Sequence, residues 1–451
     1  MPINNLPASL QAAIQQGYLQ REFEQSLRAR LGWRAIADRE PFMAGIGETI
    51  TKTRAGLLAA ATSPLAIAAN TDITNGISPQ TTPIEQYVLG IAQYGNGTDL
   101  NVATSRVAIA NLFLNNAKAL GENSLRSVDM LVVNAAFNAY LSGNTRVRTT
   151  LGAAGLTVSV DDIRGFQTVP QLGGIPAAVS PAIPLTVTVN GNGYSVVGAV
   201  ADGTNVSTSP GGVSGTLTFS GNVSIADGTA GNAVVSSIAP QILRASATQG
   251  GPSVATSAAI TPGLFNSGKL TINTLLAAKA SLEANSVPPV EQSGLYRAFV
   301  DPIHMTGLYT DPVFQQFFRG QSQSEEYKRG KVAELLGMEV VTTHLSPVQA
   351  LSGNNIRRAF VTGQGSIVEG AFTNAAYRAA ADATVDDEAI TVIDGIAHIV
   401  AEPIDRLKQV VRQSWSYIGG FAVPTDLTAN PSVIPTASNS AFKRAVVVES
   451  L

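Results

Sequence analysis

The chain has 451 residues, which is room for roughly two or three compact units with hydrophobic cores. Only 14% of its residues are charged and 45% are hydrophobic. Because roughly 25% charged residues are usual in soluble proteins, we expect partners to cover part of the surface. The net charge of -3 argues against a dedicated nucleic-acid binder, which would carry a basic face. The absence of cysteine excludes disulfides and thiolate metal sites and is typical of folding in a reducing cytoplasm.

The N-terminal region predicts neither export nor membrane insertion. No charged residue comes before Arg21, and the stretch has no apolar core of the signal-peptide type. The longest apolar run, Ala55–Ala69, is interrupted by Thr62, Ser63 and Pro64 and is too short to span a bilayer. We therefore expect no secretion and no membrane segment.

An amphipathic helix is predicted near the N-terminus. Asn5 can cap this helix, and Pro7 suits its first turn. Its apolar stripe, flanked by charged residues, consists of Leu10, Ile14, Leu19, Phe23, Leu27 and Leu31. Two interpretations remain equally open: a helix that packs on its own domain, or an arm that packs on a neighbouring subunit.

A long β-hairpin is predicted next. The stretch Ala44–Arg54 alternates threonine with other residues, and Ile84–Tyr94 is rich in β-branched and aromatic residues. An Ala-, Thr- and Pro-rich loop separates the two predicted strands. Because a two-stranded hairpin is unstable alone, it must rest on the body of the same chain or on the next subunit.

The stretch Asn101–Gly143 predicts one long amphipathic helix with an irregularity near Gly121. Its apolar residues recur at the three-and-four spacing of one helix face. They are Ile109, Leu112 or Phe113, Ala117, Leu120, Leu125, Val128, Val132, Ala135 and Tyr140. We expect this helix to join an extended half of the chain to an α/β half.

The composition changes between about Gly165 and Pro262, where the only charged residues are Asp202, Asp227 and Arg244. Asn-Gly and Asp-Gly pairs indicate tight turns in this segment. The predicted strands are Leu185–Val189, Tyr194–Val200, Thr216–Ser220, Asn222–Ala226 and Ala233–Ile238. The sequence therefore predicts a small all-β insert, with an autonomous β module from about Ile183 to Leu243.

The remaining chain predicts an α/β body. Helices are expected at Leu270–Ala284 and Asp311–Phe318. Strands are expected at Tyr296–Val300, Met338–Thr342, Arg358–Val361 and Ser366–Val368, within Glu388–Val400, and at Trp415–Ala422 and Phe442–Val448.

The usual signatures of catalysis are missing from the sequence. His304, His344 and His398 lie far apart and outside metal-type spacings, so we interpret them as structural or surface histidines. The chain has no G-x-S-x-G elbow and no phosphate-binding loop. The Gly-x-Gly stretches at 191–193 and 363–365 lack the full dinucleotide fingerprint and are interpreted as turns. We predict no enzymatic activity, no catalytic, cofactor-binding or metal-binding residues, and no cofactor.

Several short stretches follow one another in a characteristic order. They are Gln93-Tyr94-Gly95 with Thr98-Asp99, Ala119–Asn123 with Ser127-Val128-Asp129, Val287–Pro289 before Leu295–Pro302, Gly337–Thr342, and Glu402–Asp405 before Trp415. Together with the order of arm, hairpin, long helix and α/β body, they resemble the major capsid proteins of tailed bacteriophages with the Hong-Kong-97-type fold, and in particular the podophage-type branch. The resemblance covers most of the chain except about 150–262, and it depends on the order and spacing of the stretches.

The resemblance implies an α+β fold with peripheral and axial domains and a small all-β insertion domain. The implied parts are an N-terminal arm at 1–40, an extended β-hairpin loop at 41–100, a spine helix of the peripheral domain at 101–150, a β-rich insertion domain at 151–262, an axial domain at 263–400, and C-terminal strands that return to the peripheral domain at 401–451. The insert departs from the minimal pattern of the family. Exterior decoration or subunit contact are the roles expected of it.

The resemblance further implies a major capsid protein that self-assembles as pentamers and hexamers into an icosahedral head shell around phage double-stranded DNA. The implied partners are other copies of the chain, portal and scaffolding proteins, and packaged DNA through non-specific contact, with a decoration protein as a further candidate. The implied location is the virion, after assembly in the host bacterial cytoplasm. The residues alone indicate only an assembly-forming structural protein. The alternatives are a tail, fibre or surface-layer protein with a β-rich display domain and, third, a carbohydrate hydrolase.

Three charged residues of the predicted hairpin are candidates for inter-subunit contacts: Glu48, Lys52 and Arg54. An exposed ion pair contributes only about 0–1 kcal/mol, but a closed shell repeats it in every subunit. We expect Lys52→Glu combined with Arg54→Glu to lower the assembly yield while the isolated subunit stays folded. Covalent crosslinking through Lys52, known in some relatives, needs a matched Asn and Glu that the sequence does not identify, so we do not predict it.

Overall fold

The computed structural model describes residues 32–42, 49–55, 58, 61–62, 64, 77, 84–101, 109–171, 174–245, 252–254, 268–290, 294–319, 334–351, 354–372, 390–401, 406, 409–426 and 441–451. The predicted N-terminal helix and Glu48 lie outside this part. The chain divides into two units, which are described separately: the first takes the described parts of 1–50, 88–135 and 367–422, and the second those of 51–87, 136–366 and 423–451. Both contain helix and strand, so the predicted α+β class is confirmed at this level.

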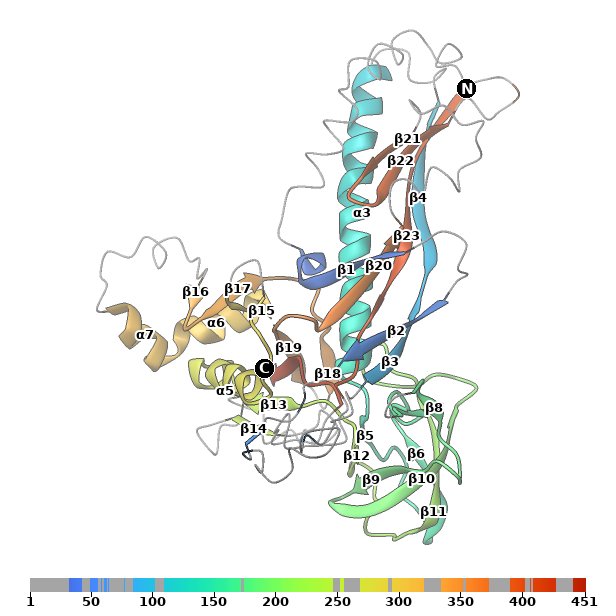
Figure 1. Ribbon diagram of the computed structural model, residues 1–451, viewed down its shortest axis with the longest axis vertical. Coiled ribbons are helices and arrows are strands. Elements are labelled where there is room, and N and C mark those ends of the chain that lie inside the picture. Colours follow the sequence, from blue (N-terminus) through green and yellow to red (C-terminus); the bar gives the residue numbers. More distant parts are fainter. Residues whose placement is uncertain are drawn as a thin grey trace. The chain divides into compact units, whose positions relative to one another are not determined.

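The first unit is built on a mixed sheet, which has six strands in the described part of the chain (Figure 1). The strands are β1 Ala37–Phe42, β4 Ala92–Asn101, β20 Ile367–Phe372, β21 Ile390–Ile393, β22 Ile396–Ala401 and β23 Val410–Ala422. Strand β23 pairs antiparallel with β4 on one side and with β22 on the other, and its C-terminal end pairs with β20. Strand β1 adds to β20 in parallel, and β21 pairs with β22. The long strand β23 is therefore the centre of this sheet.

The predicted long helix is α3, Ile109–Tyr140, with 32 residues. Its buried residues keep the expected spacing and include Phe113, whereas the alternative Leu112 is 39% exposed. Gly121 is buried and the helix continues through it, so the expected irregularity is absent from this described helix. Leu120 and Val128 of α3 pack with residues of β22 and β23 in one core cluster. The helix thus supports the sheet of the first unit.

The second unit contains an α/β body with an eight-stranded sheet among its described residues. The strands are β13 Ile242–Ala245, β14 Pro252–Val254, β15 Tyr296–Val300, β16 Glu334–Leu335, β17 Met338–Thr342, β18 Gln349–Leu351, β19 Asn354–Thr362 and β24 Ala445–Ser450, in the order β14-β13-β24-β19-β15-β17-β16 with β18 beside β19. The helices are α5 Ile272–Ala284, α6 Pro302–Thr310 and α7 Pro312–Arg319. Side chains of Thr271, Asp301 and Asp311 accept hydrogen bonds from backbone N–H groups in the first turns of these helices. Helix α6 is not among the predicted elements; Asp301 caps it and Pro302 is its first residue.

A second sheet of this unit is the β module, residues 144–236. Its strands are β5 Asn144–Arg146, β6 Gly155–Val160, β9 Leu185–Val189, β10 Asn192–Ala201, β11 Gly215–Val223 and β12 Ala233–Ser236, in the order β5-β12-β9-β10-β11-β6. The ends of this order also meet, because Arg148 N–H donates to the Ser159 carbonyl at 2.8 Å and Val147 bridges Val160. The sheet therefore closes into a barrel around its own cluster of buried Val, Leu, Ile and Phe residues.

Asp227 ties the turns of the β module together. Its carboxylate accepts hydrogen bonds from the side chains of Asn190, Asn192, Tyr194 and Ser224 at 2.6 to 3.3 Å. The bond from the Tyr194 hydroxyl is the main cause that lowers the pKa of Asp227 to about 2. This explains why one of the few charged residues of the segment stands between two turns.

Two smaller sheets have two strands each in the described residues. They are β2 Thr49–Ala55 with β3 Ile84–Gly90, and β7 Thr168–Val169 with β8 Ala177–Ala178. The first of them confirms the predicted hairpin pairing. Among the described helices, none combines the length and the apolarity that crossing a membrane requires.

Many predicted elements agree with the structure, and Tyr296–Val300 and Met338–Thr342 agree residue for residue. The predicted strand Ile84–Tyr94 is wrong as one unit, because β3 ends at Gly90 and β4 begins at Ala92. The predicted strands Thr216–Ser220 and Asn222–Ala226 are also wrong. They form the single strand β11, which stays paired with β6 across an irregularity between Thr218 and Val223.

The limits of the β module differ from the predicted ranges 151–262 and 183–243. Strand β5 comes before both predicted starts, and β6 lies inside 151–262 but before 183. The barrel needs both strands to close. At the other end, Leu243 lies in β13, which pairs with β24 in the eight-stranded sheet. Composition alone did not mark these limits because β5 and β6 contain Arg146 and ordinary apolar residues.

Candidate functional site

The β2–β3 hairpin has one buried and one exposed face. On β3, Glu85, Tyr87 and Leu89 are buried, whereas Ile84 and Val88 are each 45% exposed. The alternate residues Thr49, Thr51 and Thr53 of β2 are also exposed. The hairpin therefore presents an uncharged face of β-branched side chains, which is the type of surface that packs well against another protein surface.

The three predicted contact residues have different surroundings. Glu48 lies outside the described residues, and Lys52 is half-buried. Arg54 is mostly buried, with 17% of its side chain exposed, and its Nη1 lies 3.5 Å from Asp426 Oδ1. Burial lowers the pKa of Arg54, and the charge of Arg444 adds to this while Asp426 opposes it. The structure therefore pairs Arg54 within its own chain.

Arg54, Asp426 and Arg444 form a root cluster where strand β2 ends. Arg444 Nε donates to Asp426 Oδ1 at 3.1 Å, and Arg444 Nη1 donates to the Gln364 carbonyl at 3.2 Å. The backbone at Gly365 has a positive φ of 73°, and a Cβ there would lie 2.7 Å from Arg444 Nη1 and 2.8 Å from Arg54 Nη2. The stretch 363–365 is thus a turn, as predicted, and its last glycine makes room for two guanidinium groups.

Sequence reasoning missed Asp426 and Arg444. Both lie more than three hundred residues after Arg54 in the sequence. No local motif surrounds either residue. The signal that was available is Gly365, because a glycine that ends a tight turn between two strands often marks a close approach of other groups.

A second cluster anchors the segment before β2 on the first unit. Arg34 donates from Nε and Nη2 to the Glu369 carboxylate at 2.6 to 3.0 Å, and Tyr417 donates its hydroxyl to the same carboxylate at 2.9 Å. Arg39 lies 3.4 Å from Glu369 and also pairs with Asp394. These five residues are the anchor cluster. Its centre, Glu369, is fully buried.

Burial and charge act in opposite directions in the anchor cluster. Burial disfavours the charge on Arg34, but the hydrogen bond and the charge of Glu369 outweigh it and raise the pKa of Arg34. Burial is the largest cause that raises the pKa of Tyr417, and the carboxylate of Glu369 adds to it. Arg34 and Tyr417 therefore stay protonated, and both can donate hydrogen bonds to the buried carboxylate of Glu369.

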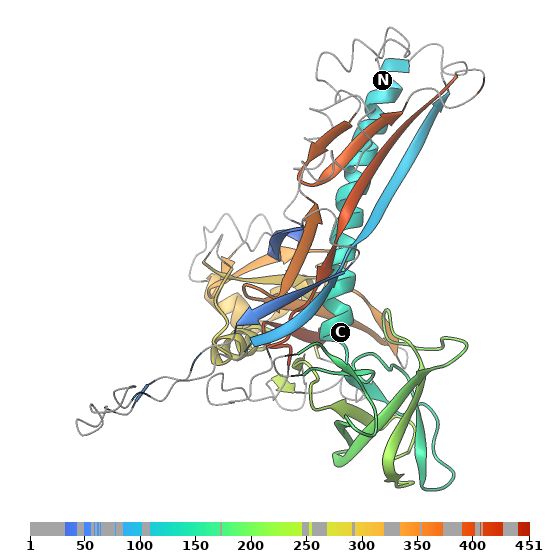
Figure 2. The ribbon, with the colours of Figure 1, turned by 45° about the vertical axis from the view of Figure 1, so that its right-hand side comes forward.

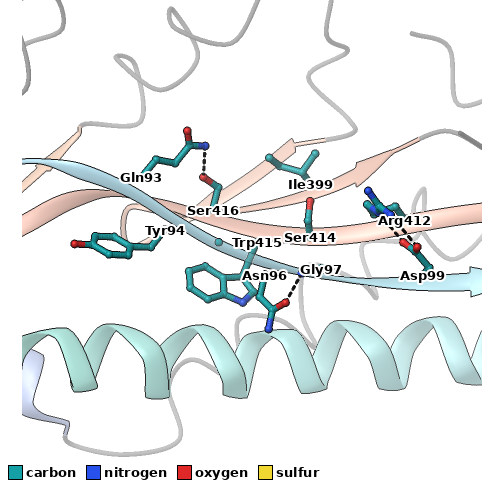
Figure 3. A pocket seen from close by; sticks show the side chains of 11 residues that line it. Gln93, Tyr94, Asn96, Gly97, Asp99, Ile399, Arg412, Ser414, Trp415 and Ser416 are labelled. Atoms are coloured by element: carbon teal, nitrogen blue, oxygen red, sulfur yellow. Dashed lines mark hydrogen bonds and ion pairs between the residues drawn. The ribbon is translucent and has the colours of Figure 1, made fainter. Parts of the chain in front are cut away.

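The β4–β23 ladder has two different faces. Toward α3, Trp415 Nε1 donates to Asn123 Oδ1 at 2.9 Å and Gln413 Nε2 donates to the Phe113 carbonyl at 3.1 Å. The other face carries an open groove of about 650 Å³, which Figure 3 shows from close by. We call it the outward groove. Its lining is Gln93, Tyr94, Gly95, Asn96, Gly97, Asp99, Ile399, Arg412, Ser414, Trp415 and Ser416.

Small side chains make the middle of the outward groove. Gly97 is directly opposite Ser414, and Gly95 is opposite Ser416. At one end of the ladder Arg412 donates to Asp99 at 2.6 and 2.8 Å, and this hydrogen bond is the main cause that lowers the pKa of Asp99. Both side chains remain about half exposed, at 48% and 46%. The middle of the groove is therefore made of small residues, although Tyr94, Ile399 and Trp415 also line it. Among its lining residues, only Asp99 and Arg412 at one end are charged.

The histidines have no shared site. His304 and His398 are buried, and His344 is exposed. Within the described ranges, no three His, Asp or Glu side chains are grouped in a way that could hold a metal ion.

No protein-family model and no curated protein matches the chain. Solved structures of low identity do match. The capsid of Ralstonia phage GP4 is similar over 92% of this chain and 87% of its own, with 12% identity and a TM-score of 0.46. The capsid of cyanophage Pam1 is similar over 95% and 91%, with 11% identity and a TM-score of 0.43. The head of Helicobacter pylori bacteriophage KHP40 is similar over 94% and 92%, with 8% identity and a TM-score of 0.41.

These similar structures are phage capsids and a phage head, the class of protein that the sequence stretches resemble. The similarity extends over nearly the whole length of each chain. Because the TM-scores lie below 0.5, the function proposed below rests on the residues and the geometry of this chain.

Proposed function

We propose that this chain is the major capsid protein of a tailed bacteriophage, which assembles as pentamers and hexamers into an icosahedral head shell. The observation that carries the proposal is the β2–β3 hairpin. It is a separate two-stranded sheet whose exposed face carries Ile84, Val88 and three threonines. Two strands are only marginally stable in water, so an element whose exposed face is uncharged and includes Ile84 and Val88 is a candidate to pack against another surface.

The order of elements supports the same function. An anchored segment, a hairpin, the long helix α3 and an α/β body follow one another in the order of the Hong-Kong-97-type fold that the sequence resembles. In this assignment α3 with β4 and β23 forms the peripheral domain, and the eight-stranded sheet with α5 forms the axial domain. The extended loop that begins with β2 lies across a neighbouring subunit.

The β module fits the role of an insertion domain. The chain enters it after Gly143 and leaves it at Ser236, and Ser236 N–H donates to the Gly143 carbonyl at 2.8 Å. Adjacent ends are what an inserted domain requires. Its arginines are paired inside the module, as Arg148 with Asp202 and Arg164 with Asp162, both at 2.7 Å. A closed barrel without unpaired sheet edges is suited to display on the shell.

The proposal includes the partners of a head shell. Copies of the chain are the main partners, with portal and scaffolding proteins and a decoration protein as further ones. Contact with the packaged double-stranded DNA is non-specific, because a net charge of -3 does not provide the clustered cations that tight phosphate binding requires. The location is the virion, after assembly in the bacterial cytoplasm.

Substitutions at the hairpin test the proposal. The two substitutions of the predicted double variant are expected to have different effects. Arg54 is paired with Asp426, so Arg54→Glu would place a second carboxylate beside Asp426. We expect Arg54→Glu to lower the free energy of unfolding by about 3–5 kcal/mol, as for other broken buried pairs. We expect Lys52→Glu to leave the subunit folded and to lower the yield of sedimenting particles. An unchanged particle yield for Lys52→Glu at all salt concentrations would remove Lys52 from the contact.

A further inference from the structure

Strand β4 is an edge strand in the described structure. It pairs with β23 and with no other described strand, and both Figure 1 and Figure 2 show it as the outermost strand beside β23. The exposed residues of β4 are Ala92, Gln93, Gly95, Asn96, Gly97 and Asp99. The exposed residues thus extend from Ala92 to Asp99, and Tyr94 and Thr98 between them are partly buried.

This edge lacks most of the features that normally prevent edge-to-edge pairing. One of its backbone donors is already used, since Gly97 N–H donates to Asn96 Oδ1 at 2.9 Å, and a second strand would have to replace that bond. Proteins protect such edges with proline, lysine, bulges or very short strands. Strand β4 has ten residues, AQYGNGTDLN, with neither proline nor lysine, and its register with β23 runs without a shift from Asn101↔Val410 to Ala92↔Gly419. Its one charged residue, Asp99, is already neutralised by Arg412. A long, regular and uncharged edge is a template for another strand.

We propose that β4 pairs antiparallel with β4 of a second copy of this chain, around a two-fold axis at Asn96. The inference rests on the proposed function only in that copies of the chain meet in an assembly. A two-fold axis perpendicular to the sheet keeps the outward grooves of both copies on one side, so directly opposite residues must belong to the same face of β4. The axis then passes through a residue, and the exposed residues, Ala92 to Asp99, are centred between Gly95 and Asn96.

The side chains are complementary in this register. Gly95 of one copy lies opposite Gly97 of the other, so no side chains collide over the middle of the groove. Gln93 lies opposite Asp99 of the other copy, which places an amide donor beside a carboxylate at both ends of the contact. Tyr94 lies opposite Thr98 on the other face. No like charges face each other.

The neighbouring registers are less favourable. An axis at Gly95 pairs only seven residues of β4 with their counterparts, because Asp99 would pass the start of the strand at Ala92. An axis at Gly97 places the Asp99 carboxylate opposite Gly95, which offers no side-chain donor. The axis at Asn96 pairs nine residues, Ala92 to Leu100, and gives each Asp99 a partner.

The outward groove continues across this axis. Figure 3 shows Gln93 at one end of the groove and the Asp99–Arg412 pair at the other. Across the axis, Gln93 of each copy would lie next to the Asp99–Arg412 pair of the other copy. The glycines and serines between them form one uncharged floor across both copies. The pairing therefore adds to the β4–β23 sheet without moving β23 or α3.

The chain has no cysteine, so single cysteines test the contact on a clean background. Opposite Cα atoms in an antiparallel pair are about 4.5–5.5 Å apart, which lies within the range of a disulfide. With full-length protein assembled into particles and treated with diamide, Asn96→Cys is expected to form a covalent dimer. The matched control, Gln93→Cys, is expected to stay monomeric, since its two copies would lie roughly 20 Å apart. Mixed Gln93→Cys and Asp99→Cys chains are expected to form the heterodimer.

The outcomes separate the inference from the proposed function. Particles that form with Asn96→Cys but contain no disulfide overturn the β4 contact and leave the capsid function intact. Dimers of Gln93→Cys with itself overturn the register. If the chain forms no particles and Asn96→Cys also stays monomeric in solution, both the function and the contact fail.

A charge variant tests the axis without any crosslink. Asn96→Lys and Asn96→Asp each place like charges opposite each other at a two-fold axis, so each variant alone is expected to lower the particle yield. Co-expression of the two variants is expected to restore the yield, because lysine then faces aspartate. Equal loss of yield in the mixture, with both subunits folded by the fluorescence of Trp415, contradicts the two-fold contact.

Discussion

Glu369→Gln is the most informative stability test of the first unit. The substitution keeps the size of the side chain and removes its charge. In the folded chain the Glu369 carboxylate accepts from Arg34 Nε and Nη2 and from the Tyr417 hydroxyl at 2.6 to 3.0 Å, and it is fully buried. A glutamine would place an amide N–H₂ group against one of these donors. Arg34 would then remain buried without its main counter-charge.

The expected loss follows from this geometry. Removing one partner of a buried ion pair costs about 3–5 kcal/mol, which is a large share of the roughly 5–15 kcal/mol that stabilise a typical domain. The matched control is Asp394→Asn, which removes a carboxylate from the same arginine but at a side chain that is 48% exposed. An exposed pair contributes about 0–1 kcal/mol, so the control should change stability little.

Tryptophan fluorescence during denaturation in urea measures both variants. The chain has two tryptophans. They are Trp33 and Trp415, both buried in the first unit. Their signal therefore reports the unfolding of this unit. A double variant with methionine at positions 34 and 369 should recover part of the loss, because an apolar pair of similar volume needs no counter-charge. If Glu369→Gln is as mild as Asp394→Asn, the anchor cluster does not stabilise the unit as described.

Three further predictions concern the rest of the chain. Asp227→Ala should lower the free energy of unfolding by about 2–3 kcal/mol, and equal melting temperatures of the variant and the natural chain at pH 7 would contradict this. Because the pKa of Asp227 is lowered to about 2, the stabilisation by its carboxylate should be lost as the pH falls from about 4 toward 2. Burial lowers the pKa of His304 and His398 to about 4, so below pH ~6.5 protons bind these histidines more tightly in the unfolded chain than in the folded one. The free energy of unfolding should therefore be highest above pH ~6.5 and about 2 kcal/mol lower per histidine at pH 5. A melting temperature that does not change between pH 7 and pH 5 would refute this. Replacing residues 144–236 with a short Gly/Ser linker should leave shells of unchanged size, whereas folded subunits that fail to close would place the β module in the lattice.

The elements that the sequence predicts well are those with a local pattern. Strands β15 and β17 are short apolar runs between turn residues, and their bounds agree with the prediction. In α3 the three-and-four spacing selected many of the buried residues, among them Ala117, Leu120, Val128, Val132 and Tyr140. Leu125 and Ala135 are only partly buried, and the buried Val133, Ala136 and Phe137 were not predicted. Gly121 did not interrupt the helix because it lies on the buried side, where tertiary packing outweighs the low helix propensity of glycine.

The clusters could not be predicted because their partners are distant in sequence. Arg34 and Glu369 are 335 residues apart, and no pattern around either residue indicates a buried ion pair. Closure of the β module depends on β5 meeting β6, and β5 has only three residues. Charge patterning named Arg54 as a surface contact, whereas its position beside Asp426 depends on the folding of the C-terminal segment. Local propensity carries little information about such long-range pairs.

Electron microscopy of the purified full-length protein tests the capsid function most directly. The proposal predicts closed icosahedral shells of uniform size, formed by the chain with or without a scaffolding protein. Fibres or flat sheets would favour a tail, fibre or surface-layer protein. Discrete small oligomers that never close would contradict the proposed function.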